Sequence, residues 1–389
     1  MTQLTITLSF LRPEEIQADC SLVSRQPFAC DVSFSLAASL QIGPARLEGE
    51  PCPARPLEAP RYDYMPPAQR VCFPGSKGGR RLEFSYGGGL TGWAFSLDPV
   101  LRSLNIQSAW RPFDFPFPLD AATVQTQTTA NSFVPFGRME EGMWKLTTQF
   151  QGNPFDDLLA SNFALIDLSR CSLAQGRALW ACCRSPRELP VLQAACRLYD
   201  QVLDFYQTQL YEPLKRPRQF LLSFSCQEDS GGYFTPRGMV ATAMPQNLDR
   251  LIHWLAHEGA HAWCAGAPMS WQDWLNETTA EWSALLFALS QGKREFFRQT
   301  IERRRQGLAD GGVIRTPDGA APPDVHERGT ILFYHLYKKY GREAIARLLR
   351  LYQTLPLPRT TEAFLAALSP LSPQIAADID RNLNRSDFM

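Results

Sequence analysis

The hydrophobic pattern of the sequence changes its period near residue 185, and this change limits the folds that the chain can adopt. Before that position, short alternating runs of apolar and polar residues recur between prolines and glycines, for example at 4–10, 81–86 and 145–150. Alternation with a period of two is typical of half-buried strands, and frequent turn residues favour antiparallel pairing. After it, apolar residues recur every three or four positions, which predicts helices. The sequence therefore predicts a multidomain protein, with an antiparallel β-sandwich-like domain at 1–185 and a mostly helical α+β domain at 186–389.

The second half contains a predicted strand and a series of helices. The strand is expected at 218–226, and a glycine-rich, edge-like segment is expected at 231–243. Ser270 is expected to cap the helix that follows it. The basic run at 293–308 is expected to be the solvated face of an amphipathic helix. Helices are predicted at 190–211, 248–264, 271–290, 293–308, 328–340, 342–352, 361–368 and 373–384.

Length and composition exclude several classes of function. The chain has 389 residues, enough for two domains with cores of their own, and its 44% hydrophobic and 20% charged residues are typical of globular proteins. Lysine and arginine together number 39, as do aspartate and glutamate. This balance gives no basis for nucleic acid or an anionic membrane as the main partner. No apolar stretch approaches the length of a membrane span.

The N-terminus and the cysteines indicate the cellular compartment. The chain has no lysine or arginine before Arg12, and it lacks the apolar run and cleavage site of a secretory signal. Its ten cysteines are irregularly spaced and include no CxxC pair. Such usage is typical of reduced, mostly buried thiols. We therefore expect a cytoplasmic protein.

Residues 257–261 read His-Glu-Gly-Ala-His and match the pattern H-E-x-x-H. Residues four apart lie on one face of a helix, so the imidazoles of His257 and His261 can reach a single metal ion. Glu258 lies one position further round, where its carboxylate can approach a water on that metal without binding the metal itself. The structural alternative is a pair of core histidines bonded to carboxylates. With five histidines in the whole chain, a chance match to this pattern is rare.

A catalytic zinc ion takes three protein ligands and leaves one position open. Glu277 is the candidate for the third, because it follows His261 after fifteen residues, on the next predicted helix. Two antiparallel helices joined by a short turn would bring it over the histidine pair. Glu281 lies one turn further on and is expected to accept a hydrogen bond from His257, which would fix the tautomer of that ring. The alternative for Glu281 is an exposed helix carboxylate. The sequence thus predicts one Zn²⁺ per chain.

These motifs resemble the signatures of a known family. The stretch WLNETTAEW at 274–282 is similar to the W-L-N-E-G-F-A-x-Y signature of the gluzincin aminopeptidases, the alanyl aminopeptidase and leukotriene hydrolase group. HEGAHAW at 257–263 resembles their H-E-L-A-H-Q-W, and thermolysin is similar more distantly. A weaker likeness covers VHERG at 325–329, which resembles the family's Y-E-K-G, and Trp110-Arg-Pro in the first half. The resemblance implies a thermolysin-like zinc peptidase domain in the second half.

The sequence departs from the family pattern at three places. The family usually has eighteen residues between the second histidine and the glutamate, where this chain has fifteen. The family's G-A-M-E-N strand carries a glutamate that binds the free amine of the substrate. In this chain Gly231, Gly232 and Tyr233 occupy that region, and we expect them to contact the substrate. His326 stands where the resemblance places the family's transition-state tyrosine, and an imidazole can also donate a hydrogen bond to an oxyanion. The alternative for His326 is a loop histidine at a helix start.

The sequence favours a zinc-dependent hydrolase of peptide or peptide-like amide bonds, with Glu258 as the general base and a peptide or small molecule as substrate. One alternative is a zinc hydrolase acting on a non-peptide substrate, such as an ester, an epoxide or a biosynthetic intermediate. The other is a non-catalytic binding protein on a peptidase scaffold. Glu258 opposes the second alternative, because a protein without catalysis needs no general base.

Overall fold

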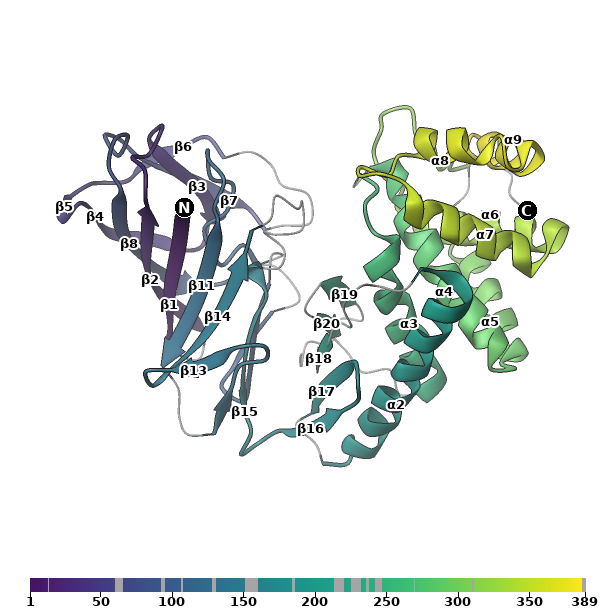
Figure 1. Ribbon diagram of the computed structural model, residues 1–389, viewed down its shortest axis with the longest axis horizontal. Coiled ribbons are helices and arrows are strands. Elements are labelled where there is room, and N and C mark those ends of the chain that lie inside the picture. The colour runs from purple at the N-terminus through teal and green to yellow at the C-terminus, as the bar shows by residue number, and fades with distance from the viewer. Residues whose placement is uncertain are drawn as a thin grey trace. The chain divides into compact units, whose positions relative to one another are not determined.

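The computed structural model divides the chain into two compact units (Figure 1). The strand-rich unit contains Met1–Ala174, Trp180–Leu192 and Phe220–Ala243, and the helical unit contains Gln175–Leu179, Gln193–Gln219 and Met244–Met389. The expected domain boundary at 185 stays a prediction. Of the segments 220–224, 232–235 and 238–241 only the backbone is described. The described residues are 1–12, 14–59, 66–91, 95–105, 108–127, 131–150, 160–183, 186–212, 220–224, 232–235, 238–241, 247–268, 270–309 and 311–386.

The largest sheet of the strand-rich unit is mixed rather than purely antiparallel. Its strands are β1 (Thr2–Arg12), β2 (Glu15–Ser24), β4 (Gln41–Leu47), β5 (Glu50–Pro51), β8 (Arg81–Gly89), β11 (Ala121–Gln127), β13 (Arg138–Glu140) and β14 (Met143–Gln149). They are ordered β13-β14-β11-β1-β2-β8-β4-β5. β1 pairs antiparallel with β2 but parallel with β11 (Figure 1). Gln3 of β1 lies opposite Ala121 of β11. The parallel pair corrects the expected antiparallel domain. It arises because the chain adds β4, β5 and β8 on the β2 side of the sheet before it returns, as β11, to the other side of β1 in the same direction.

Three smaller sheets contain the remaining named strands. They consist of β3 (Val32–Ala37), β6 (Arg55–Leu57) and β7 (Ala68–Phe73); of β9 (Ser96–Asp98), β10 (Leu101–Leu104), β12 (Ser132–Phe133) and β15 (Phe163–Asp167); and of β16 (Ser172–Gln175), β17 (Leu179–Cys183), β18 (Phe220–Phe224), β19 (Gly232–Thr235) and β20 (Gly238–Ala241). In the last sheet β20 pairs parallel with β18 and antiparallel with β19. The predicted edge-like segment therefore contains two strands, and β19 is the outer one.

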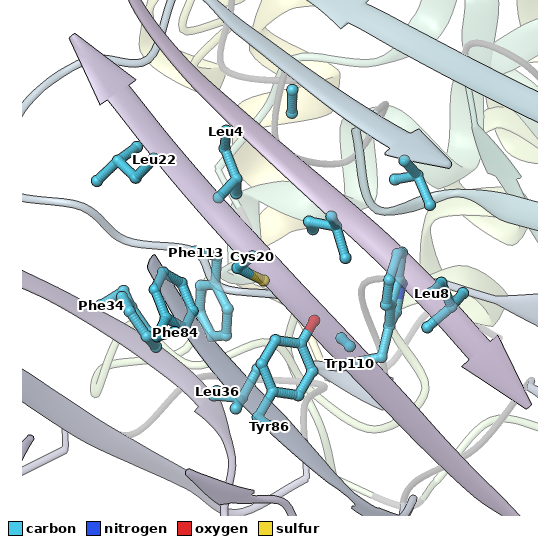
Figure 2. Close-up of a cluster of buried hydrophobic side chains, with 14 of the residues drawn as sticks. Leu4, Leu8, Cys20, Leu22, Phe34, Leu36, Phe84, Tyr86, Trp110 and Phe113 are labelled. Carbon is cyan, nitrogen blue, oxygen red and sulfur yellow. The ribbon is translucent and has the colours of Figure 1, made fainter. Parts of the chain in front are cut away.

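The core of the strand-rich unit lies between the large sheet and the three-stranded sheet (Figure 2). Alternate residues of β1, such as Leu4, point into it. Phe34 of β3 stacks on Phe84 of β8 with ring centroids 4.9 Å apart, a geometry that adds to the burial of both rings. Trp110 enters the same core, and its indole N–H donates to the Ser161 carbonyl at 2.7 Å. This packing of sheet on sheet agrees with the sandwich-like part of the expectation.

All helices predicted from the sequence are present. Asn247 caps α3 (Leu248–Cys264) by accepting from the Asp249 N–H at 2.8 Å. Ser270 accepts from the Gln272 N–H at 3.2 Å, as a capping residue does. No helix in the described part of the chain is long and apolar enough to cross a membrane. The helices are α2 (Leu189–Phe205, continued by a π-helical turn at Tyr206–Leu210), α3 (Leu248–Cys264), a 3₁₀ turn (Trp271–Asp273), α4 (Trp274–Ser290), α5 (Arg294–Gln306), α6 (Val325–Tyr340), α7 (Arg342–Thr354), α8 (Thr361–Leu368) and α9 (Pro373–Leu383).

Helix α4 is the centre of the helical unit. It packs against α3, α5, α6 and α7, and a helix buried on several sides is apolar nearly all round. Trp274 and Trp282 are fully buried. Their indole N–H groups donate at 3.0 Å to the Thr361 hydroxyl and to the Thr330 carbonyl. The polar edges of both rings are thus satisfied inside the core.

Helix α6 begins at Val325, earlier than the predicted start at Arg328. The Arg328 side chain donates to Asp324 at 2.8 Å, and both residues are buried. Asp324 also accepts from the Ala309 N–H at 2.7 Å. This buried ion pair, with its partners one helical turn apart, stabilises a first turn that the apolar pattern does not show. His326 therefore lies inside the helix rather than in the loop before it.

Gly329 allows α4 and α6 to approach each other closely. A Cβ added at position 329 would overlap the Thr278 hydroxyl oxygen and lie 3.1 Å from Thr278 Cβ. We expect Gly329→Ala to lower the free energy of unfolding by about 1–3 kcal/mol, the usual cost of overpacking a core, although alanine is favoured over glycine in a helix by roughly 1 kcal/mol. Urea denaturation followed by circular dichroism measures the change.

Gly89→Ala is the control for this substitution. A Cβ added there would have the Glu14 carbonyl oxygen as its nearest neighbour, at an ordinary contact distance of 3.7 Å. Equal stability of the wild type and Gly329→Ala would contradict the close approach of the two helices.

Candidate metal centre

Helix α3 carries the two histidines of the H-E-x-x-H motif on one face. The ring centroids of His257 and His261 are 5.1 Å apart, and the ring planes meet at 81°. The side chains are 12% and 13% exposed, so bulk water reaches neither ring freely. Burial lowers the pKa of His261 to about 4. That ring is therefore neutral near pH 7, and a nitrogen lone pair is available to a metal.

A buried amide fixes the connection between α3 and α4. Asn276 Oδ1 accepts from the Ala267 N–H at 2.9 Å and from the Tyr352 hydroxyl at 2.7 Å. Its Nδ2 donates to the Ala267 carbonyl at 3.1 Å and to Asp273 Oδ1 at 2.8 Å. Both donors and both lone pairs of the amide are thus in use. Because Glu277 directly follows Asn276, this network sets where its carboxylate lies.

Arg359 closes the C-terminal end of α3. Its guanidinium donates to the carbonyls of Trp263 and Ala265 at 2.6 and 2.7 Å. Its backbone N–H donates to the Gly266 carbonyl at 2.8 Å. The last carbonyls of a helix lack helical partners, and their partial negative charge favours a cation. The turn after α3 is therefore held from both sides, by Arg359 and by the Asn276 amide.

Glu277, in the first turn of α4, places its carboxylate beside both imidazoles. Oε2 lies 3.2 Å from His257 Nε2, and Oε1 lies 3.7 Å from His261 Nε2. One ligand atom from each of the three residues lies within 4.8 Å of the others. In a tetrahedral zinc site with bonds of about 2.0–2.1 Å, ligand atoms are about 3.3–3.4 Å apart. The spacing fits such an ion, and two imidazoles with one carboxylate are a known donor set of catalytic zinc.

The carboxylates around His257 attract positive charge. Burial opposes a charged imidazole, but the hydrogen bonds with Glu277 and Glu281 and their charges outweigh it and raise the pKa of His257 to about 10. Burial likewise opposes ionisation of Glu277, yet the charge that His261 acquires at low pH and the hydrogen bond with His257 hold the pKa of its carboxyl well below its usual range. A divalent cation would displace the proton of His257 and balance the same carboxylates.

Glu281, one turn after Glu277, has a side chain that is 2% exposed, and its Oε2 is hydrogen-bonded to His257 Nδ1 at 2.9 Å. Oε1 accepts from Arg304 Nε at 3.2 Å and lies 3.6 Å from His253 Nε2. Burial alone would raise the pKa of this carboxyl. The charges of His253 and Arg304 and the hydrogen bond from His257 hold that pKa well below its usual range instead. Glu281 is therefore a buried partner of His257 and not an exposed helix carboxylate.

Glu258 lies on the same helix as the histidines and is 7% exposed. Burial raises the pKa of its carboxyl to about 7, against the opposing charge of His257. The next residue, Gly259, has no side chain, and a Cβ added there would come within 2.8 Å of Tyr199 Cε2. The ring of Tyr199 therefore packs directly on α3 beside Glu258. A carboxyl with a pKa near neutrality can both accept and return a proton.

His326, in the first turn of α6, reaches the same cluster. Its side chain is 47% exposed, and Nδ1 lies 3.5 Å from Glu277 Oε2. Asp273, Glu277 and His326 form a second group whose ligand atoms lie within 4.8 Å of one another. Because Glu277 belongs to both groups, they make one cluster, and His326 is its more accessible side.

The structure leaves undescribed the side chains of the residues that are expected to contact the substrate. Gly231 is outside the described residues, and Gly232 and Tyr233 belong to β19, whose backbone alone is described. Their contact with substrate stays a prediction.

Sequence reasoning missed residues that position the site. Asn276 and Arg359 act on the α3–α4 turn, and Arg304 acts on Glu281. The asparagine directly precedes the glutamate within the WLNE motif, which was a usable signal. Arg304 carried none, because the basic run around it predicted a solvated helix face. Its side chain is instead 26% exposed and paired with two carboxylates.

Comparison with known proteins identifies the fold. The M1 zinc metallopeptidase of Deinococcus radiodurans superposes with a TM-score of 0.60 at 16% identity, covering 99% of this chain and 92% of that one. The leukotriene A4 hydrolase of Saccharomyces cerevisiae superposes with a TM-score of 0.66 at 15% identity, covering 99% of this chain and 67% of that one. No family model matches the sequence, and no curated protein matches it either. The chain therefore has the fold of M1 metallopeptidases, and the resemblance to gluzincins is confirmed at the level of fold.

We expect one Zn²⁺ per chain in purified protein, because the His257, His261 and Glu277 ligand atoms have the spacing of a zinc site. Elemental analysis after dialysis measures it, and His261→Ala should lose the ion. His335→Ala, which removes an exposed histidine of α6, should retain it. Wild-type protein that takes up no zinc, or a zinc-loaded His261→Ala variant, would refute the ligand set.

Proposed function

We propose that this protein is a zinc-dependent hydrolase of peptide or peptide-like amide bonds. The observation that carries the proposal is the convergence of His257, His261 and Glu277, with the buried carboxyl of Glu258 on the same helix as the histidines. On this proposal the helical unit is the counterpart of a thermolysin-like catalytic domain.

The residues of the chain divide the work of such a reaction. A zinc ion held by the three ligands would supply Lewis acidity, polarising a scissile carbonyl and lowering the pKa of a water molecule. Glu258 would accept the proton of the attacking water and return it to the leaving amine. Its pKa of about 7, raised chiefly by burial, suits both steps. His326, half exposed beside Glu277, would donate a hydrogen bond to the oxyanion.

The similar structures support a peptide as the substrate class. A variant of the Deinococcus radiodurans enzyme is bound to the substrate Tyr-Ser-Ala, and the yeast leukotriene A4 hydrolase is bound to bestatin. The yeast protein's name also favours a second candidate, a zinc hydrolase acting on a non-peptide substrate. Amino-acid amides, dipeptides, esters and epoxides assayed side by side would separate the two.

Glu258→Gln should keep the zinc and lose turnover. The amide is nearly isosteric with the carboxylate but cannot accept the proton of water, so we expect kcat to fall by at least about 10²–10⁴-fold. Activity and zinc content are measured on the same sample. Glu302→Gln, the same substitution at an exposed position of α5, is the control. Full activity in zinc-loaded Glu258→Gln protein would exclude Glu258 as the general base. A wild-type protein that binds peptides without cleaving them would favour the alternative of a non-catalytic binding protein.

We do not expect the protein to recognise its substrate mainly through the free N-terminal amine. An ammonium near the metal is costly to desolvate without a carboxylate partner, and no acid occurs in the sequence from Gly231 to Thr235. The measurement compares kcat/KM for one peptide with a free and with an acetylated N-terminus. A preference for the free form above about tenfold, or 1.4 kcal/mol, would contradict the expectation. Glu228 and Asp229, which lie outside the described residues, would then be the acids to substitute.

A further inference from the structure

Arg304 joins the metal-binding cluster to two other helices. It lies in the last turn of α5, and its Nε donates to Glu281 Oε1 of α4 at 3.2 Å. A second guanidinium nitrogen donates to Glu327 Oε1 of α6 at 2.8 Å. Arg298, on the same helix, has a side chain that is 76% exposed, against 26% for Arg304. The guanidinium of Arg304 is thus paired with the buried Glu281 and the partly buried Glu327, unlike that of an ordinary surface arginine.

The two oxygens of Glu281 have different partners, and for this reason Arg304 determines how the Glu281 carboxylate is oriented. Oε1 is held by Arg304, while Oε2 is hydrogen-bonded to His257 Nδ1 at 2.9 Å. A carboxylate fixed at one oxygen cannot rotate freely about its last bond. The Nδ1 proton of His257 is therefore held, and the nitrogen left for a metal ion is Nε2, which faces Glu277 Oε2 at 3.2 Å.

Burial makes this cation necessary to Glu281. The side chain of Glu281 is 2% exposed, and an ionised carboxylate at such a position is strongly destabilising without a charged partner. His253 Nε2 approaches to 3.6 Å, which is beyond hydrogen-bonding distance. Arg304 therefore supplies the hydrogen bond to Oε1 that balances the His257 bond to Oε2.

Glu327 in turn orients Arg304. A planar guanidinium can hold two carboxylates at fixed angles, which a lysine ammonium cannot do. The space for Glu327 exists because position 307 is glycine: a Cβ added there would lie 2.9 Å from Glu327 Cγ. The sequence of contacts runs from Glu327 through Arg304 and Glu281 to His257, and it links α6, α5, α4 and α3.

We propose that Arg304 is a positioning residue of the metal centre, which holds Glu281 on His257 and thereby sets the affinity of the site for zinc. The proposal rests on the proposed function, since it takes His257 as a zinc ligand. It assigns Arg304 no contact with substrate.

The test measures zinc affinity by competition with a chromophoric chelator, so it needs no substrate. We expect Arg304→Gln and Glu281→Gln each to weaken zinc binding by about 10–100-fold, the usual effect of losing an outer partner of a metal ligand. Arg304→Lys, which keeps the charge but not the fork, should fall between Arg304→Gln and the wild type. Arg298→Gln, an exposed arginine of the same helix, should match the wild type.

A double-mutant cycle separates positioning from general stabilisation. If Arg304 acts through Glu281, Arg304→Gln should add little to the loss already caused by Glu281→Gln, whereas independent structural effects would add. Additive losses would overturn the proposal, as would wild-type affinity in a folded Arg304→Gln protein. If Arg304→Gln does not fold, Arg304→Lys and Glu327→Gln decide, and wild-type affinity in both would overturn it.

The outcomes also separate this proposal from the proposed function. Zinc binding and hydrolysis by the wild type, with unchanged affinity in the Arg304 variants, would reject only the role of Arg304. Failure of the wild type to bind zinc would reject both.

Discussion

The contact between the Glu277 carboxylate and the imidazoles of α3 is the interaction on which the helical unit depends. If the three side chains hold one ion, as we propose, the two helices must meet within a fraction of an ångström for the ligand atoms on both to fit it. Three features hold that meeting in place: the saturated amide of Asn276, the guanidinium of Arg359 at the end of α3, and the burial of α4 among its neighbours. A site whose ligands come from rigid helices can be held more accurately than one built on loops.

The same cluster is electrostatically costly to the fold. Glu258, Glu277 and Glu281 are all largely buried. Among the described residues, and apart from the histidines, Arg304 is the cation that forms a hydrogen bond with one of these carboxylates. Removing carboxylates from water without full compensation destabilises a folded chain. A bound divalent cation reverses that balance, so ion binding and folding free energy are linked at this site. The arrangement is typical of functional sites, where residues required for the reaction lower the local stability of the fold.

The sequence predicted the features that depend on local periodicity and missed those that depend on distant contacts. The helix at 248–264 was placed correctly because its apolar residues recur with the helical period, and the structure adds an Asn247 cap at its start. The spacing of His257, His261 and Glu277 was readable since one helix pair determines it. The parallel pairing of β1 with β11 was not, because strand direction across a long crossover leaves no local trace. Arg304 was missed for the same reason: its partners lie on other helices, and charge alone does not show which arginine in a run turns inward.

The close approach of α4 and α6 has a consequence for how this sequence can diverge. Thr278 and Gly329 occupy a space that holds one side chain, so neither position can be exchanged independently. An alanine at 329 becomes acceptable only where 278 is reduced to alanine or glycine, and a glycine in either helix costs roughly 1 kcal/mol of helix propensity. In related sequences the two positions should therefore covary, so that a larger side chain at one position occurs with a smaller one at the other. Such a pair of positions would mark the chains in which α6, and with it His326, stays at this distance from His257, His261 and Glu277.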